Sequence, residues 1–163
     1  MTSTNPNSSR DSTIAASEGL ASKTSNFFTV FVDKHVYGLD VKEAETIFKV
    51  GPITPIPLTH PEVSGFINLR GKIVVAVSLR RRLGIPETGG ICEKFAISLE
   101  AANEHFALLV DRVGDVLALP ASARTEIPPH YTSRQSLFTR DLYLYDSKLT
   151  PILDVSRLFD FSI

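Results

Sequence analysis

The chain has 163 residues, of which 43% are hydrophobic, and a formal net charge of -1 at pH 7. This length allows one or two small domains with an ordinary hydrophobic core. The balanced charge argues against a protein that binds many phosphate groups at once, which would need a clear excess of basic residues. No apolar stretch approaches the roughly 20 residues of a membrane helix. The N-terminus lacks the order of a signal peptide, and the single Cys92 cannot form an internal disulfide. We therefore expect a cytoplasmic protein with no direct membrane insertion.

The first 25 residues differ in composition from the rest. They hold thirteen Ser, Thr or Asn residues, and only Ile14 and Leu20 are large and apolar. So little apolar surface cannot offset the entropy lost when a segment becomes ordered. We expect a disordered tail over residues 1–25 and a folded domain over residues 26–160.

The folded part has the pattern of short β-strands. Aromatic, β-branched and alternating runs are separated by turn residues, and three prolines within Pro52–Pro57 predict an extended loop. The expected strands are Phe27–Val32, His35–Val41, Ile47–Val50, Phe66–Arg70 and Ile73–Val77. A tight turn at Gly71 joins the last two, and it carries Arg70, which has no acidic neighbour close in sequence. A charged residue at a rigid turn is a candidate for contact with a partner.

A short helix should follow the last of these strands. Ser78 stands at the N-cap position before Leu79–Leu83, and Gly84 is placed to end the helix. The run Arg80–Arg82 is typical of the exposed side of a helix end, where positive charge suits the helix dipole. We do not expect it to bind nucleic acid.

The second half of the chain repeats the pattern of the first. Tyr37–Phe48 aligns with Phe106–Leu117 at an offset of 69 residues, and Lys72–Leu79 aligns with Lys148–Val155 at an offset of 76. The growth of the offset by seven predicts an insertion within Pro120–Gln135. Two similar β units, each too small to bury a core well alone, are expected to pack together. Short strands at this spacing favour small barrels, which leave no exposed sheet edge.

Three segments carry more specific motifs. They are Asn68-Leu69-Arg70-Gly71 followed by Lys72-Ile73-Val74, Leu109–Leu117 with its Val-Asp and Val-Leu spacing, and Leu149–Leu158. Pro128-Pro129 adds a proline pair between the last two. Together these segments resemble the CheW-like domain family, over roughly residues 26–160.

The resemblance implies an all-β fold of two SH3-like five-stranded β-barrel subdomains, roughly residues 26–90 and 91–160, intertwined and packed together with short helices. It also implies a non-catalytic adaptor that couples the cytoplasmic tip of chemoreceptors to the regulatory domain of a CheA-type histidine kinase. Such a protein is cytoplasmic and is recruited to membrane-associated receptor arrays. Flagellar chemotaxis and pilus-based motility both stay open.

The same resemblance implies receptor-binding residues. Arg70 matches the family's receptor-side arginine, with Asn68 and Leu69 in the same turn, while Gly65 and Gly71 match structural glycines. The remaining candidates are Ala44, Thr46 and Val113. Two of them depart from the family, because Ala44 replaces a valine and Thr46 replaces a glutamate. Glu45 is one position away and is expected on the opposite face of its strand.

An enzyme would need a constellation of reactive groups. Cys92 and the four histidines His35, His60, His105 and His130 are scattered, without the spacing of zinc ligands or a nucleophile elbow. Asp111 and Asp115 are four residues apart across an expected strand junction, but Asp111 belongs to a family motif. We expect no enzyme, no cofactor and no metal.

The alternative function is a small β-barrel binding module for a ligand or single-stranded nucleic acid. Tyr143 and Tyr145 share one face of an expected strand and could stack on bases. Asp141 and Asp146 flank them, which argues against a polyanion as partner. The resemblance also places Asp141 where the family has a glycine, which implies a backbone shape that suits aspartate less well.

Overall fold

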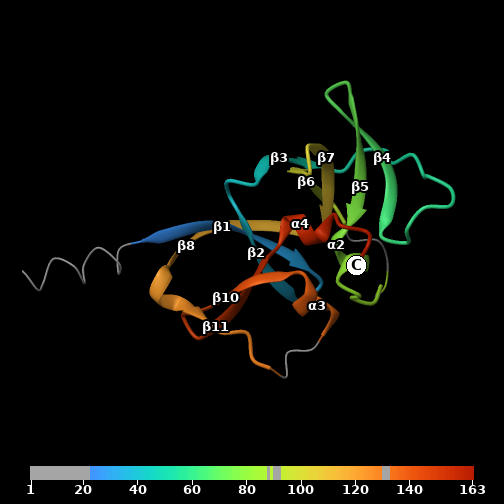
Figure 1. Cartoon of the computed structure of the whole chain (residues 1–163). Coiled ribbons are helices and arrows are strands. Elements are labelled where there is room, and N and C mark those ends of the chain that lie inside the picture. Colours follow the sequence, from blue (N-terminus) through green and yellow to red (C-terminus); the bar gives the residue numbers. More distant parts are fainter. Residues whose placement is uncertain (1–22, 88, 90–92, 130–132) are drawn as a thin grey trace, which may run out of the picture.

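The computed structural model describes residues 23–87, 89, 93–129 and 133–163. These residues form two curved β-sheets that lie side by side, with short helices at their contact (Figure 1). The first seven strands are β1 (Thr24–Val32), β2 (His35–Asp40), β3 (Ala44–Lys49), β4 (Val63–Leu69), β5 (Lys72–Ser78), β6 (Phe95–Ala101) and β7 (Glu104–Val110). The others are β8 (Arg112–Pro120), β9 (Arg124–Thr125), β10 (Thr139–Tyr145) and β11 (Lys148–Leu153). The helices are α2 (Leu79–Arg82), η1 (Ala121–Ala123), α3 (Arg134–Leu137) and α4 (Val155–Leu158).

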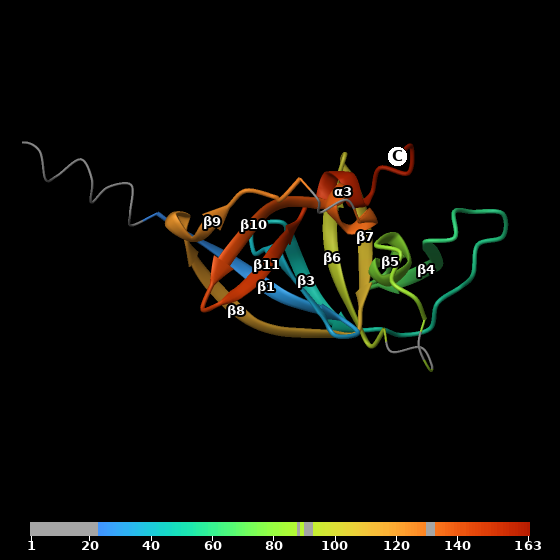
Figure 2. The ribbon, with the colours of Figure 1, turned by 90° about the horizontal axis from the view of Figure 1, so that it is seen from below.

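The two ends of the chain form one sheet and its middle forms the other. The end sheet has the strand order β8-β1-β2-β11-β10-β9, and the middle sheet has the order β3-β6-β7-β5-β4. Figure 2 shows the end sheet, mostly blue, orange and red, beside the green and yellow strands of the middle sheet. The chain crosses to the middle sheet after β2 and returns after β7. Each sheet therefore combines strands from both sides of residue 90.

The internal repeat organises the antiparallel pairing. In the end sheet Val30 of β1 pairs with Val113 of β8, and in the middle sheet Leu99 of β6 pairs with Ala44 of β3. Val30 corresponds to Leu99 and Ala44 to Val113 at the offset of 69, so each pair is the repeat counterpart of the other. The first hairpin of each repeat thus lies beside the crossing strand of the other repeat.

The parallel pairing follows the same rule. Ile152 of β11 pairs with Gly38 of β2, and Ala76 of β5 pairs with Ala107 of β7. These residues correspond through the offsets of 76 and 69 that the sequence predicts. Both β-sheets are therefore built on one plan, related by a pseudo-two-fold, and their first hairpins are exchanged.

The extra residues of the second repeat lie where the sequence predicts them. The isolated bridge Thr54–Phe66 in the middle sheet corresponds to the pair Thr125–Leu142 between β9 and β10. The offset between the repeats is 69 before β9, 71 at β9 and 76 at β10. Most of the insertion therefore lies between β9 and β10, where α3 also lies.

Three clusters of buried side chains hold the sheets. The largest lies between the two sheets and takes residues from both, including Val30, Leu99, Val77 and Leu153. The middle sheet curls around Ile67, Val74, Ala76, Ala96, Ala107 and Leu109, and the end sheet curls around Phe27, Leu119, Tyr143 and Ile152. The predicted all-β fold with two SH3-like units is confirmed, with one correction: the sheets remain open rather than closing into barrels.

Strand bounds differ from the predicted ones where backbone pairing extends past the apolar run. β1 begins at Thr24, which pairs with Pro120, and Ser25 pairs with Leu119. Residues 1–22 of the predicted tail lie outside the described residues. β3 begins at Ala44, three residues before the predicted Ile47, because Ala44 pairs with Leu99.

The predicted cap of α2 is confirmed, and α4, at the repeat counterpart, has a cap of the same kind. The Ser78 hydroxyl accepts a hydrogen bond from the backbone N–H of Arg81 at 3.2 Å, and the Asp154 carboxylate accepts one from the N–H of Arg157 at 3.1 Å. Gly84 follows the C-cap of α2 with φ +69°, a left-handed conformation that ends the helix. No helix within the described ranges is long and apolar enough to cross a membrane.

The arginine run is not simply an exposed helix end, which corrects the prediction. Only Arg81 is exposed, whereas Arg80 is 7% exposed and Arg82 is 2% exposed. The guanidinium of Arg80 pairs with Asp111 at 2.6 Å. Arg80 therefore points toward Asp111, and Arg82 points toward the end of α4.

Arg82 joins the two repeats through their helices. Its Nε donates to the carbonyl of Leu158 at 2.9 Å, and its guanidinium lies 4.6 Å from the centre of the Phe138 ring. Burial lowers the pKa of Arg82, and the nearby Glu62 carboxylate opposes that shift. The charge is therefore buried with partners on several sides.

We expect Arg82→Ala to lower the free energy of unfolding by about 3–5 kcal/mol, because it removes one partner of a buried charged network and leaves carbonyls unpaired. The adjacent Arg81→Ala is the matched control and should cost at most about 1 kcal/mol, since its pair with Glu87 is exposed. Urea denaturation of both variants measures the difference. Equal costs would contradict the assigned role of Arg82.

Candidate binding site at the Arg70 turn

Arg70 and Gly71 form the two-residue turn between β4 and β5, which projects from the middle sheet (Figure 1). Their φ angles are +50° and +85°, and Leu69 pairs with Lys72 on either side. Positive φ at both central residues defines a type I′ turn, which favours Asn and Gly. An arginine there costs about 1–2 kcal/mol, and such a strained residue supports a hypothesis of function.

The two glycines of this segment have different reasons to be glycine. Gly65 has φ +144°, and a Cβ on it would lie 2.2 Å from the carbonyl oxygen of Thr54. Gly71 has open space around it and needs only its positive φ. Its N–H donates to the side chain of Asn68 at 2.8 Å, so Asn68 braces the turn.

Arg70 borders a cavity of about 210 Å³ on the middle sheet, which we call the Arg70 hollow. Its lining residues are Glu45, Thr46, Leu69, Arg70, Lys72, Val74, Ser98 and His105. Three of the residues predicted from the sequence, Arg70, Leu69 and Thr46, therefore meet at one place.

The other candidates lie elsewhere. Ala44 and Val113 are repeat counterparts, 69 residues apart, and both are partly buried against the core between the sheets. They lie on the two strands that cross between sheets, rather than among the residues that line the Arg70 hollow. Asn68 belongs to the turn itself.

The prediction that Glu45 lies on the opposite face of its strand from Thr46 is wrong. The register of β3 against β6 shifts between Ala44 and Thr46, which marks a β-bulge. The bulge breaks the alternation of faces, so Glu45 and Thr46 both line the Arg70 hollow. A simple strand pattern cannot reveal this, because only the pairing with β6 locates the extra residue.

In the Arg70 hollow Glu45 has partners within the protein, whereas Arg70 has no ion-pair partner among the described residues. The Glu45 carboxylate accepts a hydrogen bond from the Ser98 hydroxyl at 2.8 Å and lies 3.4 Å from Nδ1 of His105. Arg70 is exposed and forms no ion pair with any residue that the structure describes. Its guanidinium is available to a carboxylate from outside. Ser98 and His105 were missed because nothing in their local sequence marks them.

The remaining chemical candidates form no reactive site. Asp111 is held by Arg80 and by the backbone N–H of Asp33, while Asp115 lines a separate hollow on the end sheet. Among the described residues no group of three or more His, Cys, Asp or Glu side chains could hold a metal ion. Cys92 and His130 lie outside those residues.

Asp141 and the tyrosines also differ from what their sequence positions indicate. Asp141 has no positive φ and is paired with Arg124 and Arg140, so it needs no glycine-like backbone. Tyr143 is buried, with its ring centre 5.4 Å from that of Phe27. Only Tyr145 is exposed, so the two do not form a stacking platform for bases.

A family model described as the CheW-like domain matches residues 26–162. The match spans most of the chain, and the chain belongs to the CheW-like domain family. The resemblance predicted from the three motifs is thereby confirmed.

Individual relatives extend over nearly the same region. Chemotaxis protein CheW of Bacillus subtilis is 26% identical over 139 residues, which cover 85% of this chain and 89% of that protein. Chemotaxis protein CheW of Thermotoga maritima is 28% identical over 132 residues, with 79% and 83% covered. The crystal structure of scaffolding protein TtCheW from Thermoanaerobacter tengcongensis matches with a TM-score of 0.77 at 28% identity, covering 85% of this chain and 94% of that one.

The two glycines of the turn segment should respond differently to a methyl group. We expect Gly65→Ala to cost more than about 3 kcal/mol of unfolding free energy, because backbone strain adds to a clash with the Thr54 carbonyl. Gly71→Ala should cost about 1–2 kcal/mol through its positive φ alone. Gly51→Ala is the control and should change stability by less than about 0.5 kcal/mol, since its surroundings are open. Thermal unfolding of the three variants tests this order.

Proposed function

We propose that this protein is a non-catalytic adaptor that couples chemoreceptors to a CheA-type histidine kinase. Membership of the CheW-like family supports a scaffolding role in chemotaxis. Its relatives are named as chemotaxis proteins, and TtCheW is described as a scaffolding protein. Pilus-based motility is an equally suitable setting for the same adaptor chemistry.

The observation that carries the receptor contact is the unpaired guanidinium of Arg70 on a rigid turn. Two hydrogen-bonded strands hold the turn, so little backbone freedom is lost when a partner binds. A guanidinium can donate two parallel hydrogen bonds to one carboxylate. A receptor tip with an acidic residue beside an apolar one would therefore fit Arg70 and the adjoining Leu69.

The adaptor would act by geometry. The core between the sheets joins both halves of the chain, so a receptor bound at the middle sheet and a kinase domain bound elsewhere keep a fixed spacing. Binding of the receptor can then shift the kinase between states in proportion to its differential affinity for them. None of these steps requires a reactive group on the adaptor.

Two matched turn variants test the receptor contact. Arg70→Asn and Asp146→Asn place the same residue, which tolerates positive φ, at equivalent turns of the two sheets. We expect Arg70→Asn to weaken binding of a receptor cytoplasmic fragment about tenfold, the equivalent of one charge-assisted hydrogen bond. Asp146→Asn should leave receptor binding unchanged. Arg70→Lys should bind the receptor fragment with an affinity between those of the natural sequence and Arg70→Asn. Lysine keeps the positive charge but cannot donate the two parallel hydrogen bonds of a guanidinium.

The fragments to use are those of the receptors and kinase encoded nearest to the gene of this protein. Binding is measured by pull-down and by titration calorimetry with the full chain. Retention of neither fragment by the natural sequence would refute the adaptor function. Unchanged receptor binding by Arg70→Asn would refute only the assignment of Arg70, provided that the kinase fragment is still retained.

A further inference from the structure

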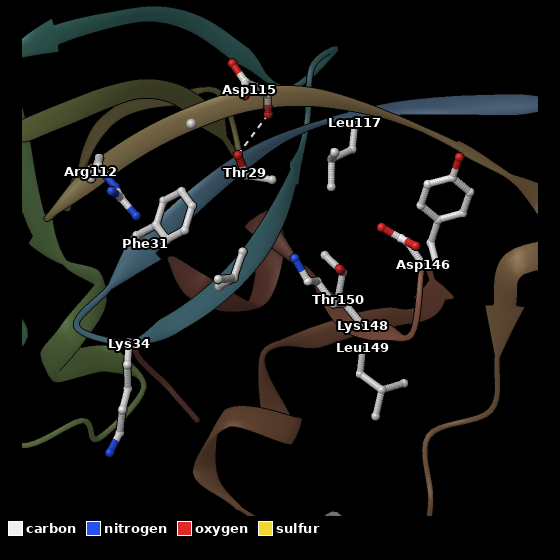
Figure 3. A pocket seen from close by; sticks show the side chains of 13 residues that line it. Thr29, Phe31, Lys34, Arg112, Asp115, Leu117, Asp146, Lys148, Leu149 and Thr150 are labelled. Atoms are coloured by element: carbon white, nitrogen blue, oxygen red, sulfur yellow. Dashed lines mark hydrogen bonds between the residues drawn. The ribbon is translucent and has the colours of Figure 1, made fainter.

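The end sheet carries a second and larger hollow, of about 790 Å³, which we call the Gly114 hollow (Figure 3). Each of the eight residues that line the Arg70 hollow has its repeat counterpart among the residues that line this one. Arg70 corresponds to Asp146, Lys72 to Lys148 and Glu45 to Gly114. The two hollows are therefore the same feature of the fold, lined by different side chains.

The bulge position accounts for part of the difference in size between the two hollows. In the Arg70 hollow the bulge residue is Glu45, whose exposed carboxylate lines the hollow beside Ser98 and His105. At the same position Gly114 has no side chain, and the counterparts of Ser98 and His105 are Thr29 and Val36. The space that a carboxylate fills in one sheet is left open in the other.

Gly114 also allows an aromatic wall. A Cβ at this position would lie 2.7 Å from Cε2 of Phe31 and 2.5 Å from Oγ1 of Thr29, so the Phe31 ring rests directly on the backbone of β8. The guanidinium of Arg112 lies 4.0 Å from the centre of that ring. Phe31 thus lies against β8 with the Arg112 cation over its ring, and it remains partly exposed in the hollow.

The charged side chains of this hollow are distributed unevenly. Figure 3 shows Arg112 against Phe31 on one side, Lys148 near the middle beside Thr150, and Asp146 on the opposite side. Across the described parts of the chain, neither Arg112 nor Lys148 forms an ion pair. Two unpaired cations next to an apolar wall are complementary to a carboxylate attached to an apolar group.

The backbone beside the hollow points to the shape of the occupant. β8 lines the hollow and is also the outermost strand of the end sheet, where β1 is its single partner among the described strands. Its other side offers N–H and C=O groups to which an extended chain can add as a further strand. A peptide along β8 would place alternate side chains toward Phe31 and Leu117.

We propose that the Gly114 hollow docks an extended segment of a partner protein in which an acidic side chain stands close to a large apolar one. The carboxylate binds between Arg112 and Lys148, the apolar side chain packs on Phe31, and the segment's backbone pairs with β8. This docking is independent of the receptor contact at Arg70.

The test is an NMR titration of the isotope-labelled full chain with a capped peptide, Gly-Glu-Phe-Leu-Glu-Gly. We expect amide shifts to cluster at Thr29, Phe31 and Gly114. Arg112→Gln and Lys148→Gln should each raise the dissociation constant of the peptide about fivefold, the effect of losing one partly exposed charged contact. Lys72→Gln, at the repeat counterpart of Lys148, is the matched control and should leave it unchanged. A peptide with lysine in place of both glutamates should bind at least tenfold more weakly.

Other outcomes would overturn the proposal. Shifts centred on the Arg70 hollow, or equal binding of both peptides, would remove the Gly114 hollow as an acidic docking site. Equal affinity for 3-phenylpropionate would identify a small-ligand site instead. Shifts at β8 that depend on protein concentration alone would identify a second copy of the chain as the occupant. Receptor binding by Lys148→Gln should be normal, so a failure here and a failure of the adaptor function are distinguishable.

Discussion

The structure depends on the exchange of hairpins between its two repeats. β1 and β2 belong to the first repeat but pair with β8 and β11 of the second, while β6 and β7 of the second pair with β3 and β5 of the first. Neither repeat can complete a sheet from its own strands. The core between the sheets then takes side chains from both repeats. Folding of one unit therefore requires the other, which makes the pair a single rigid body.

The exchange also decides where the two hollows lie. Each crossing strand, β3 or β8, contains a bulge at the same point, and each sheet ends in a type I′ turn nearby. These two irregularities leave a hollow in each sheet. Because the fold needs the bulge and the turn but not particular side chains there, the repeats have diverged at these positions. Arg70 faces one hollow and Asp146 the other, so one framework offers two surfaces of different chemistry.

The local features were accessible from the sequence because they depend on neighbouring residues. The cap at Ser78 and the turn at Gly71 follow from the conformational preferences of a few adjacent residues. The repeat was visible because both halves bury apolar side chains at matching positions. The burial of Arg80 and Arg82 was not, since their carboxylate and carbonyl partners are 31 and 76 residues away.

For this protein the sequence alone determined the β-rich class, the two-fold repeat, the family and the position of Arg70 at a tight turn between two strands. Only the tertiary structure decided which strands share a sheet, that the sheets stay open, and that Glu45 joins Arg70 and Thr46 at one hollow. The reason is physical: strand pairing joins residues that are distant in the chain, and a bulge is defined only relative to its partner strand. The open Gly114 hollow likewise exists because side chains from five strands, brought together by the hairpin exchange, leave it unfilled.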